Sequence, residues 1–96
     1  MVIPLSPGGF ADVPGRILAG RLSAELGKTV YVENRPGAGG TIGADVVAKS
    51  PADGYTLLAA SSGPISIMPS LQKLQYEPQK DFVLISLITR NPYALV

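Results

Sequence analysis

The sequence predicts an α/β protein, a three-layer lobe in which helices cover both faces of a mainly parallel β-sheet. Short apolar or β-branched runs alternate along the 96 residues with stretches whose apolar residues recur at helical spacing. Each of the first three runs ends in a loop rich in glycine or serine. Strands that alternate with helices favour parallel pairing through right-handed crossovers, which is the origin of the three layers.

The first strand and the first helix are predicted within residues 1–26. Residues 1–5 form an apolar run too short for a helix, and Ser6-Pro7-Gly8-Gly9 ends it. We expect Asp12 to be the N-cap of the helix that follows and Gly27 to be its left-handed C-cap. Four apolar residues at helical spacing form the expected inward stripe: Ile17, Leu18, Leu22 and Leu26.

The second and third units repeat this order. Residues 29–34 are β-branched and aromatic and predict a strand, and residues 41–49 predict a helix that ends before Pro51. Three residues of that helix are expected to face inward: Ile42, Val46 and Val47. Residues 55–60 are a continuous apolar run, typical of a strand covered on both faces. A short helical turn is predicted over residues 65–68.

The last part of the chain predicts a polar connector followed by more strand. Residues 76–81 are mainly polar, residues 82–88 are apolar, and another apolar run begins at residue 93. One sheet is therefore expected to hold residues 2–4, 30–33, 55–60 and 82–87. Because the last run stops at Val96, we expect the chain to be cut from a longer protein.

Composition excludes several classes of function. Eight basic and seven acidic residues are spread along the chain, which gives no electrostatic case for nucleic acid or an anionic membrane. Neither cysteine nor histidine is present, so we expect no metal site, no cofactor and no histidine-based catalysis. No apolar run reaches the roughly 20 residues of a membrane span, and no signal peptide is visible in this chain.

The three loops that follow the strands are the candidate binding elements. Parallel strands place their carboxyl ends at one edge of a sheet, where ligands bind in α/β proteins. Gly8 and Gly9 precede a helix, so their N–H groups and the helix dipole could hold an anion, with positive φ angles that only glycine adopts easily. The alternative is a turn that needs glycine only for its backbone angles. Ser61 and Ser62 offer hydroxyls, or simply cap the next turn.

The glycine-rich segment after the second strand does not match a nucleotide-binding motif. A dinucleotide fingerprint that starts at Gly37 needs glycine at position 42, which is Ile42, and Gly43 is not followed by the lysine of a phosphate-binding loop. A nucleotide-binding enzyme fragment is therefore disfavoured. The segment is either a strand-to-helix turn with close packing or a direct ligand contact.

Five segments in chain order carry a resemblance to a known family: residues 7–12, 32–40, 42–44, 51–58 and 76–82. With the block Glu-Asn-Arg-Pro-Gly-Ala-Gly-Gly at residues 33–40, the chain resembles the substrate-binding receptors of tripartite tricarboxylate transporters, the Bug family. The resemblance implies a type II periplasmic binding protein fold, whose two lobes hold the ligand between them. It also implies a periplasmic receptor that is not an enzyme, binds a small carboxylate and delivers it to membrane transporter subunits.

The resemblance also implies which residues bind the ligand. Pro7-Gly8-Gly9 matches the loop that grips a carboxylate, Phe10 falls where the pocket wall varies, and Ser61-Ser62-Gly63 matches the second binding segment. The predicted ligand-binding residues are Pro7, Gly8, Gly9, Phe10, Asp12, Ser61, Ser62 and Gly63. Residues 1–96 would be part of the first lobe, with the second lobe absent. The alternative is a truncated or repurposed α/β module that acts in protein association, with self-association through residues 93–96.

Overall fold

The computed structural model describes residues 1–90, and three parallel segments lie at its centre. Strand β1 (Val2–Ile3) is in the middle, and β2 (Glu33–Asn34) pairs with it so that Val2 lies opposite Glu33. On the other side of β1, Leu58 forms a parallel bridge with Val2. The N–H of Val2 donates to Leu57 O at 2.7 Å, and the N–H of Ala59 donates to Val2 O at 2.9 Å.

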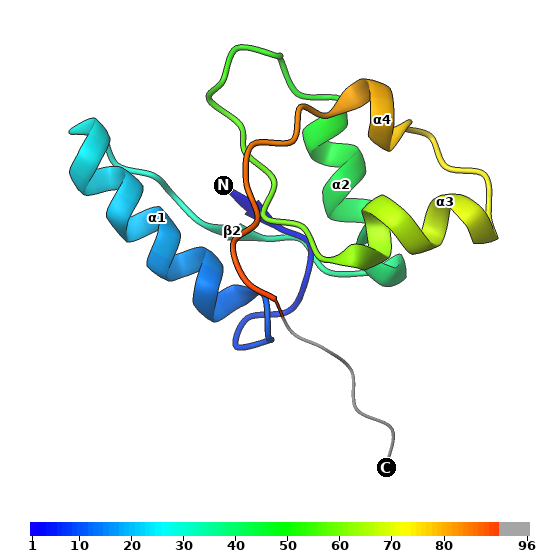
Figure 1. Ribbon diagram of the computed structural model, residues 1–96, viewed down its shortest axis with the longest axis horizontal. Coiled ribbons are helices and arrows are strands. Elements are labelled where there is room, and N and C mark those ends of the chain that lie inside the picture. Colours follow the sequence, from blue (N-terminus) through cyan, green and yellow to red (C-terminus); the bar gives the residue numbers. More distant parts are fainter. Residues whose placement is uncertain (91–96) are drawn as a thin grey trace.

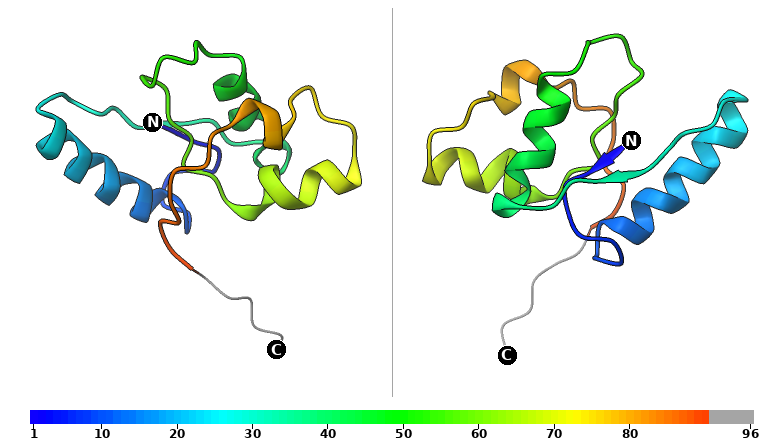
Figure 2. Two further views of the ribbon diagram at one scale, coloured as in Figure 1. Left: turned by 45° about the horizontal axis from the view of Figure 1, so that its top comes forward. Right: turned by 180° about the vertical axis from the view of Figure 1, so that it is seen from behind.

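Helices α1 (Asp12–Leu26) and α2 (Thr41–Ala48) cover opposite faces of these segments (Figure 1). Consecutive strand residues point to opposite faces. A Cβ added at Gly15 of α1 would lie 2.7 Å from Ile3 Cδ1, whereas one at Gly43 of α2 would lie 2.7 Å from Pro4 Cβ. Ile3 therefore faces α1 and Pro4 faces α2. The three-layer α/β arrangement is confirmed, and the views of Figure 2 show the same separation of the helices.

Helix α1 buries a different face from the predicted one. Its buried residues are Asp12, Gly15 and Ala19, while Ile17 and Leu26 are exposed. The expected stripe is wrong for Ile17 and Leu26, whereas Leu18 and Leu22 are half-buried. The helix approaches the sheet so closely that only small residues fit against Ile3. The C-cap prediction is confirmed, since Gly27 is left-handed with φ of 68° and its N–H donates to Ser23 O.

Asp12 is not the N-cap of α1. Ala11 occupies that position, and no side chain caps the helix there. Asp12 is the first helical residue, and its carboxylate points back to the preceding loop, where it accepts the N–H of Gly8. The prediction was wrong by one position because the carboxylate is used by the loop rather than by the free N–H groups of the first helical turn.

The second helix confirms its predicted bounds within one residue, but its buried residues are again small. Thr41, Gly43 and Ala44 are buried, and Ile42, expected to point inward, is half exposed. The third strand is shorter than predicted, since only the segment around Leu58 is paired. Three short helical segments follow: a π-helix at Gly63–Ile67, α3 (Met68–Leu71) and α4 (Pro78–Asp81).

The segment predicted as a polar connector contributes to the core. Tyr76 is only 4% exposed, and its ring contacts Phe82 edge to face with the centroids 5.7 Å apart. Its last four residues form α4. Residues 76–81 are therefore not only a solvated link, because Tyr76 packs in the core and is bonded to Pro64.

The fourth predicted strand, residues 82–87, is wrong. Residues 82–90 carry no strand, and Val83, Leu84 and Ile85 are each at least 80% exposed. An apolar run becomes a buried strand only where a neighbouring strand and helices cover it, and residues 1–90 provide neither for this segment. The predicted association through residues 93–96 lies outside the described residues.

Candidate functional site

The three candidate loops leave the same edge of the parallel segments. We call residues 6–10 the first loop, residues 35–40 the second loop and residues 61–64 the third loop. The second and third loops touch, because a Cβ added at Gly63 would lie 2.8 Å from Gly39 O. A Cβ at Gly40 would lie 3.1 Å from Pro64 Cδ. These contacts support the close-packing interpretation of the glycine-rich second loop.

The carboxylate of Asp12 ties the first loop to α1 and to β2. Its Oδ2 accepts the N–H of Gly8 at 2.9 Å, and its Oδ1 accepts Asn34 Nδ2 at 2.9 Å. Arg16 Nε lies 3.0 Å from both carboxylate oxygens. Asp12 is only 4% exposed. The N–H of Gly8, the amide of Asn34 and the Arg16 guanidinium outweigh burial and hold the pKa of Asp12 below its ordinary value.

Asn34 joins this network to the end of β1. Its Nδ2 also donates to Leu5 O at 3.0 Å, and its Oδ1 accepts Arg16 Nη2 at 2.8 Å. On either side of Asn34, Glu33 and Arg35 form an exposed ion pair at 2.8 Å. The inward role of Asn34 was missed. Its position at the carboxyl end of β2, opposite Ile3 of β1, is the signal that could have found it.

The two glycines of the first loop differ. Gly8 has φ of 81°, as the sequence predicted, but Gly9 is not left-handed. The N–H of Gly8 is taken by Asp12, and the N–H of Gly9 donates to Ser6 O at 3.1 Å. Within residues 1–90, no hydrogen bond uses the N–H groups of Phe10 and Ala11. The N–H groups that could donate to an anion are therefore those of the two residues after the glycines, and not those of the glycines themselves.

Four residues of the first loop are exposed, Ser6, Pro7, Gly8 and Phe10, whereas Gly9 is half-buried. Phe10 is 58% exposed, which suits a side chain at the wall of an open site. Asp12 lies beneath this surface. The structure thus brings five of the predicted residues together around one turn, with four in the loop and Asp12 as the support inside it.

The other three predicted residues lie in the third loop. Ser61 and Gly63 are half-buried and Ser62 is exposed, and the two serine hydroxyls make no hydrogen bond among residues 1–90. Tyr76 supports this loop, since its hydroxyl donates to Pro64 O at 2.8 Å. Burial raises the pKa of Tyr76, and the charge of Asp45 adds to this. The sequence placed Tyr76 in a polar connector, so this hydrogen bond was not predicted.

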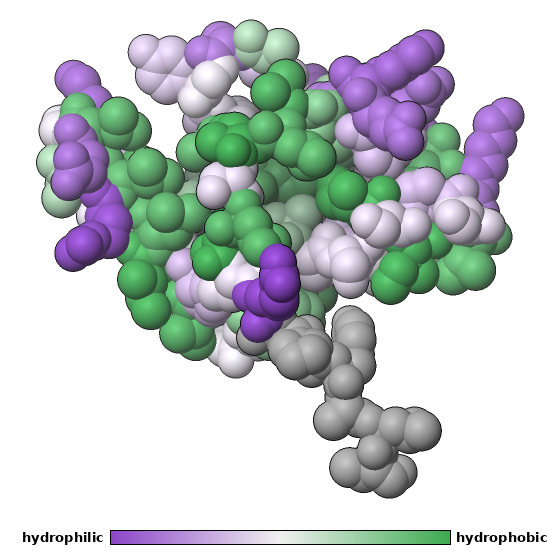
Figure 3. All heavy atoms as spheres, in the orientation of Figure 1, coloured by the Kyte–Doolittle hydropathy of each residue, from purple (hydrophilic) through white to green (hydrophobic). Residues whose placement is uncertain are grey.

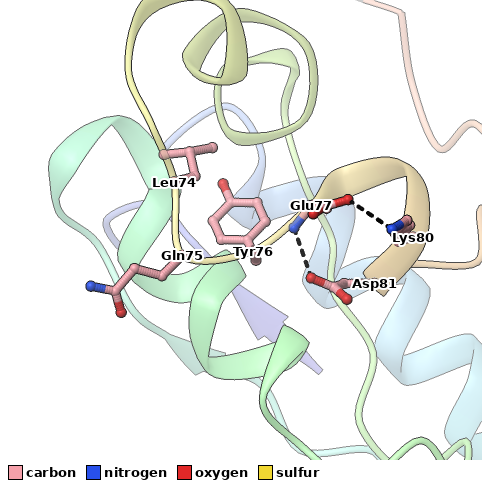
Figure 4. A pocket seen from close by; sticks show the side chains of 6 residues that line it. All are labelled: Leu74, Gln75, Tyr76, Glu77, Lys80 and Asp81. Atoms are coloured by element: carbon pink, nitrogen blue, oxygen red, sulfur yellow. Dashed lines mark hydrogen bonds and ion pairs between the residues drawn. The ribbon is translucent and has the colours of Figure 1, made fainter.

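Two grooves are lined by residues outside the three loops. One groove of about 210 Å³ is lined by residues 74–77, 80 and 81 (Figure 4). Its polar groups satisfy one another: Glu77 N–H donates to Asp81 Oδ2 at 2.7 Å, and Lys80 Nζ lies 3.6 Å from Glu77 Oε2. A second groove of about 310 Å³ lies between α2 and residues 72–76. Neither groove contains a predicted ligand-binding residue.

Two kinds of site are not found in the described part of the chain. Residues 1–90 hold no group of three or more acidic, histidine or cysteine side chains placed to bind a metal ion. No helix within the same residues is long and apolar enough to cross a membrane.

An α/β lobe of this kind is found in periplasmic binding proteins of known structure. MatC from Rhodopseudomonas palustris, solved with bound malate, matches 91% of this chain with a TM-score of 0.84 and 36% identity. The periplasmic binding protein BugD matches 60% of the chain with a TM-score of 0.58 and 50% identity. The match covers 30% of the MatC chain and 19% of the BugD chain.

Sequence comparison gives the particular family. Residues 15–96 match the model of the tripartite tricarboxylate transporter family receptor. Protein BugT of Bordetella pertussis is 46% identical over 101 residues, which cover all of this chain and 30% of BugT. A protein from the tcbD–tcbE intergenic region of Pseudomonas sp. strain P51 is 40% identical over 99% of the chain and 28% of its own length. This chain belongs to the tripartite tricarboxylate transporter receptor family, and it spans less than a third of these curated relatives.

Proposed function

We propose that this chain is part of the first lobe of a periplasmic solute receptor that binds a small carboxylate for a tripartite tricarboxylate transporter. The observation that carries the proposal is the similarity to MatC, a relative solved with malate, across 91% of the chain. Family membership supports the role of receptor, and the periplasmic relatives support the location. For the whole protein we also propose a second lobe, which closes over the ligand, and membrane transporter subunits as partners.

The chemistry of the first and third loops suits reversible binding of an anion. Neither loop contains a charged side chain, and each offers backbone N–H groups or hydroxyls. In the first loop we assign the contact to the N–H groups of Phe10 and Ala11, since those of Gly8 and Gly9 have internal acceptors. Oriented N–H groups near a helix start attract a carboxylate without a permanent counter-charge.

This set of groups supports binding without catalysis. The hydroxyls of Ser61 and Ser62 have no basic side chain bonded to them within residues 1–90, so neither is activated as a nucleophile. The only carboxylate of the first loop region, Asp12, is already bonded to Gly8, Asn34 and Arg16. We therefore propose a receptor without enzymatic activity.

The test is a titration of the ¹⁵N-labelled chain with malate, followed through amide chemical shifts. We expect changes at Phe10, Ala11, Ser61 and Ser62, with a dissociation constant of roughly millimolar because one lobe cannot enclose the ligand. The matched control is the diamide of malic acid, which keeps the hydroxyl and the size but carries no charge, and it should not bind.

Two outcomes would overturn the assignment. Shifts centred on Arg35 and Lys49, with the first loop unchanged, would mean that malate is attracted by ordinary surface charge. Equal binding of malate and its diamide would mean that the site does not recognise a carboxylate.

Protein association is the second candidate function, favoured by the exposed apolar surface. Val83 is 90% exposed, and Phe10, Val13 and Ile17 form an exposed stripe along α1. Figure 3 shows apolar surface along α1 and across the centre of this face. Light scattering at millimolar concentration separates the candidates: a monomer that binds malate supports the receptor, and an oligomer that does not bind it supports association.

A further inference from the structure

A buried carboxylate, that of Asp12, lies beneath the first loop and is bonded to groups of the chain itself. Asp12 is 4% exposed, and three donors serve its two oxygens: Asn34 Nδ2 for Oδ1, Gly8 N–H for Oδ2, and the single Nε–H of Arg16, which lies 3.0 Å from both and is shared between them. A buried carboxylate that is surrounded by donors of its own chain is poorly placed to contact a ligand. Asp12 therefore acts on the loop and not on a bound molecule.

The contact with Gly8 uses the N–H of the first glycine inside the protein. Gly8 has φ of 81°, so its N–H turns toward Asp12, and Asp12 N–H in turn donates to Gly9 O at 3.0 Å. The loop is thus closed on its inner side by a carboxylate of the chain itself. The N–H groups of Phe10 and Ala11 are left for an external anion.

Arg16 makes this arrangement compatible with an anionic ligand. A buried negative charge close to the loop would repel a carboxylate, but the Arg16 guanidinium lies 3.0 Å from it and is itself bonded to Asn34 Oδ1. Arg16 is the charged group that faces Asp12, and β2 contributes only the neutral Asn34. The charges therefore cancel locally while the loop keeps its shape.

We propose that Asp12 is a positioning residue that holds the first loop in its binding conformation by accepting the N–H of Gly8 from inside the loop. This inference rests on the proposed function, because it assumes that the loop binds the ligand. It differs from the expectation that Asp12 caps the helix or touches the ligand. Asn34 and Arg16 act through Asp12 and share this positioning role.

The first part of the test needs no ligand and no variant. In the unmodified ¹⁵N-labelled chain, the amide proton of Gly8 should shift as Asp12 is protonated, with a midpoint below 3.8, the ordinary pKa of an aspartate. The amide of Gly63, which has no carboxylate partner, should not follow that titration. A Gly8 amide that is insensitive to pH would overturn the proposal whether or not malate binds.

The second part compares Asp12→Asn with Asp45→Asn. Both carboxylates pair with a cation four residues later, Arg16 and Lys49, but Asp45 lies outside the three loops. Asp12→Asn turns one of the two acceptors into a donor that faces Arg16 and either Asn34 or Gly8, so we expect malate to bind roughly tenfold more weakly. Asp45→Asn should leave the dissociation constant within about twofold.

The two proposals fail in different ways. If the unmodified chain does not bind malate, the proposed function falls, while the pH response of Gly8 still decides whether Asp12 holds the loop. If the unmodified chain binds malate and Asp12→Asn binds it equally well with the same amides shifting, Asp12 is not a positioning residue. Should Asp12→Asn fail to fold, the Gly8 titration in the unmodified chain remains the deciding measurement.

Discussion

The first loop and the pair formed by the second and third loops are held in place by different physical means. Polar side chains hold the first loop: Asp12 takes the N–H of Gly8, and Asn34 and Arg16 hold Asp12. The other two loops are held mainly by the absence of side chains. A Cβ at Gly63 would lie 2.8 Å from Gly39 O, and one at Gly40 would lie 3.1 Å from Pro64.

Because of this difference, the first loop should be sensitive to a change of charge, and the other two loops to a change of side-chain volume. A loop that depends on a carboxylate should respond to pH and to the loss of that charge. A loop pair that depends on glycines should respond to an added methyl group, because closely packed backbone cannot move without cost. Helix α2 should also be sensitive to added volume, since Gly43 lies against Pro4 and the carbonyl of Arg35.

The largest effect is expected from Gly43→Ala in α2. The added Cβ would lie 2.7 Å from Pro4 Cβ and 2.9 Å from Arg35 O, so backbone must shift. We expect the free energy of unfolding in urea to fall by about 2 kcal/mol, even though alanine favours the helix.

The matched control is Gly20→Ala in α1, where a Cβ would meet nothing within 4 Å. That variant should gain about 0.5–1 kcal/mol of stability, because alanine loses less entropy in a helix than glycine does. Equal changes in the two variants would show that propensity and not packing decides, and would break the comparison.

A smaller effect is expected from Tyr76→Phe, which tests the hydrogen bond from the Tyr76 hydroxyl to the third loop. The change leaves the ring contact with Phe82 and removes the donor to Pro64 O. Unfolding free energy should fall by about 1 kcal/mol, as for a typical buried hydrogen bond. Tyr55→Phe is the control, since Tyr55 is 89% exposed, and should change stability by less than about 0.5 kcal/mol. No difference between the two variants would mean that Tyr76 only packs.

The smallest effect is expected from acid pH, and it should be confined to the first loop. The pKa of Asp12 is lowered in the folded chain from an ordinary value of 3.8, so its contribution to stability is complete above 3.8. That contribution is lost as the pH falls through the lower, folded value. Urea unfolding of the unmodified chain and of Asp12→Asn should therefore show a constant difference above about pH 5 and a shrinking one below 3.8. A difference that grows at low pH would contradict the network.

The candidate site could be predicted in part from residue types. The alternation of strands, glycine loops and helices indicated that the first, second and third loops share an edge, and the parallel segments around β1 confirm it. For the glycines of the second loop the sequence left close packing and ligand contact open, and the contacts of Gly40 and Gly63 support close packing. Which N–H groups remain free in the first loop was not predictable, because that depends on the side chain of Asp12 folding back by four residues.

Errors in the fold arose where the answer depends on distant neighbours. The large apolar residues of α1 looked like its inner face, yet Gly15 and Ala19 lie against the sheet, because Ile3 leaves room only for small residues. Residues 82–87 have the composition of a buried strand, but burial needs a neighbouring strand and cover, which residues 1–90 do not supply. Tyr76 looked like part of a polar link and proved to be in the core.

By itself the sequence determined the order of elements, the left-handed end of α1 at Gly27 and the glycine-rich edge, because these depend on local backbone preferences and on neighbours a few residues away. Only the tertiary structure decided that Asp12, Asn34 and Arg16 meet under the first loop. It also decided that Gly39 and Gly63 touch. Contacts between residues 18 to 24 positions apart follow from the packing of strands and helices, which local pattern does not encode.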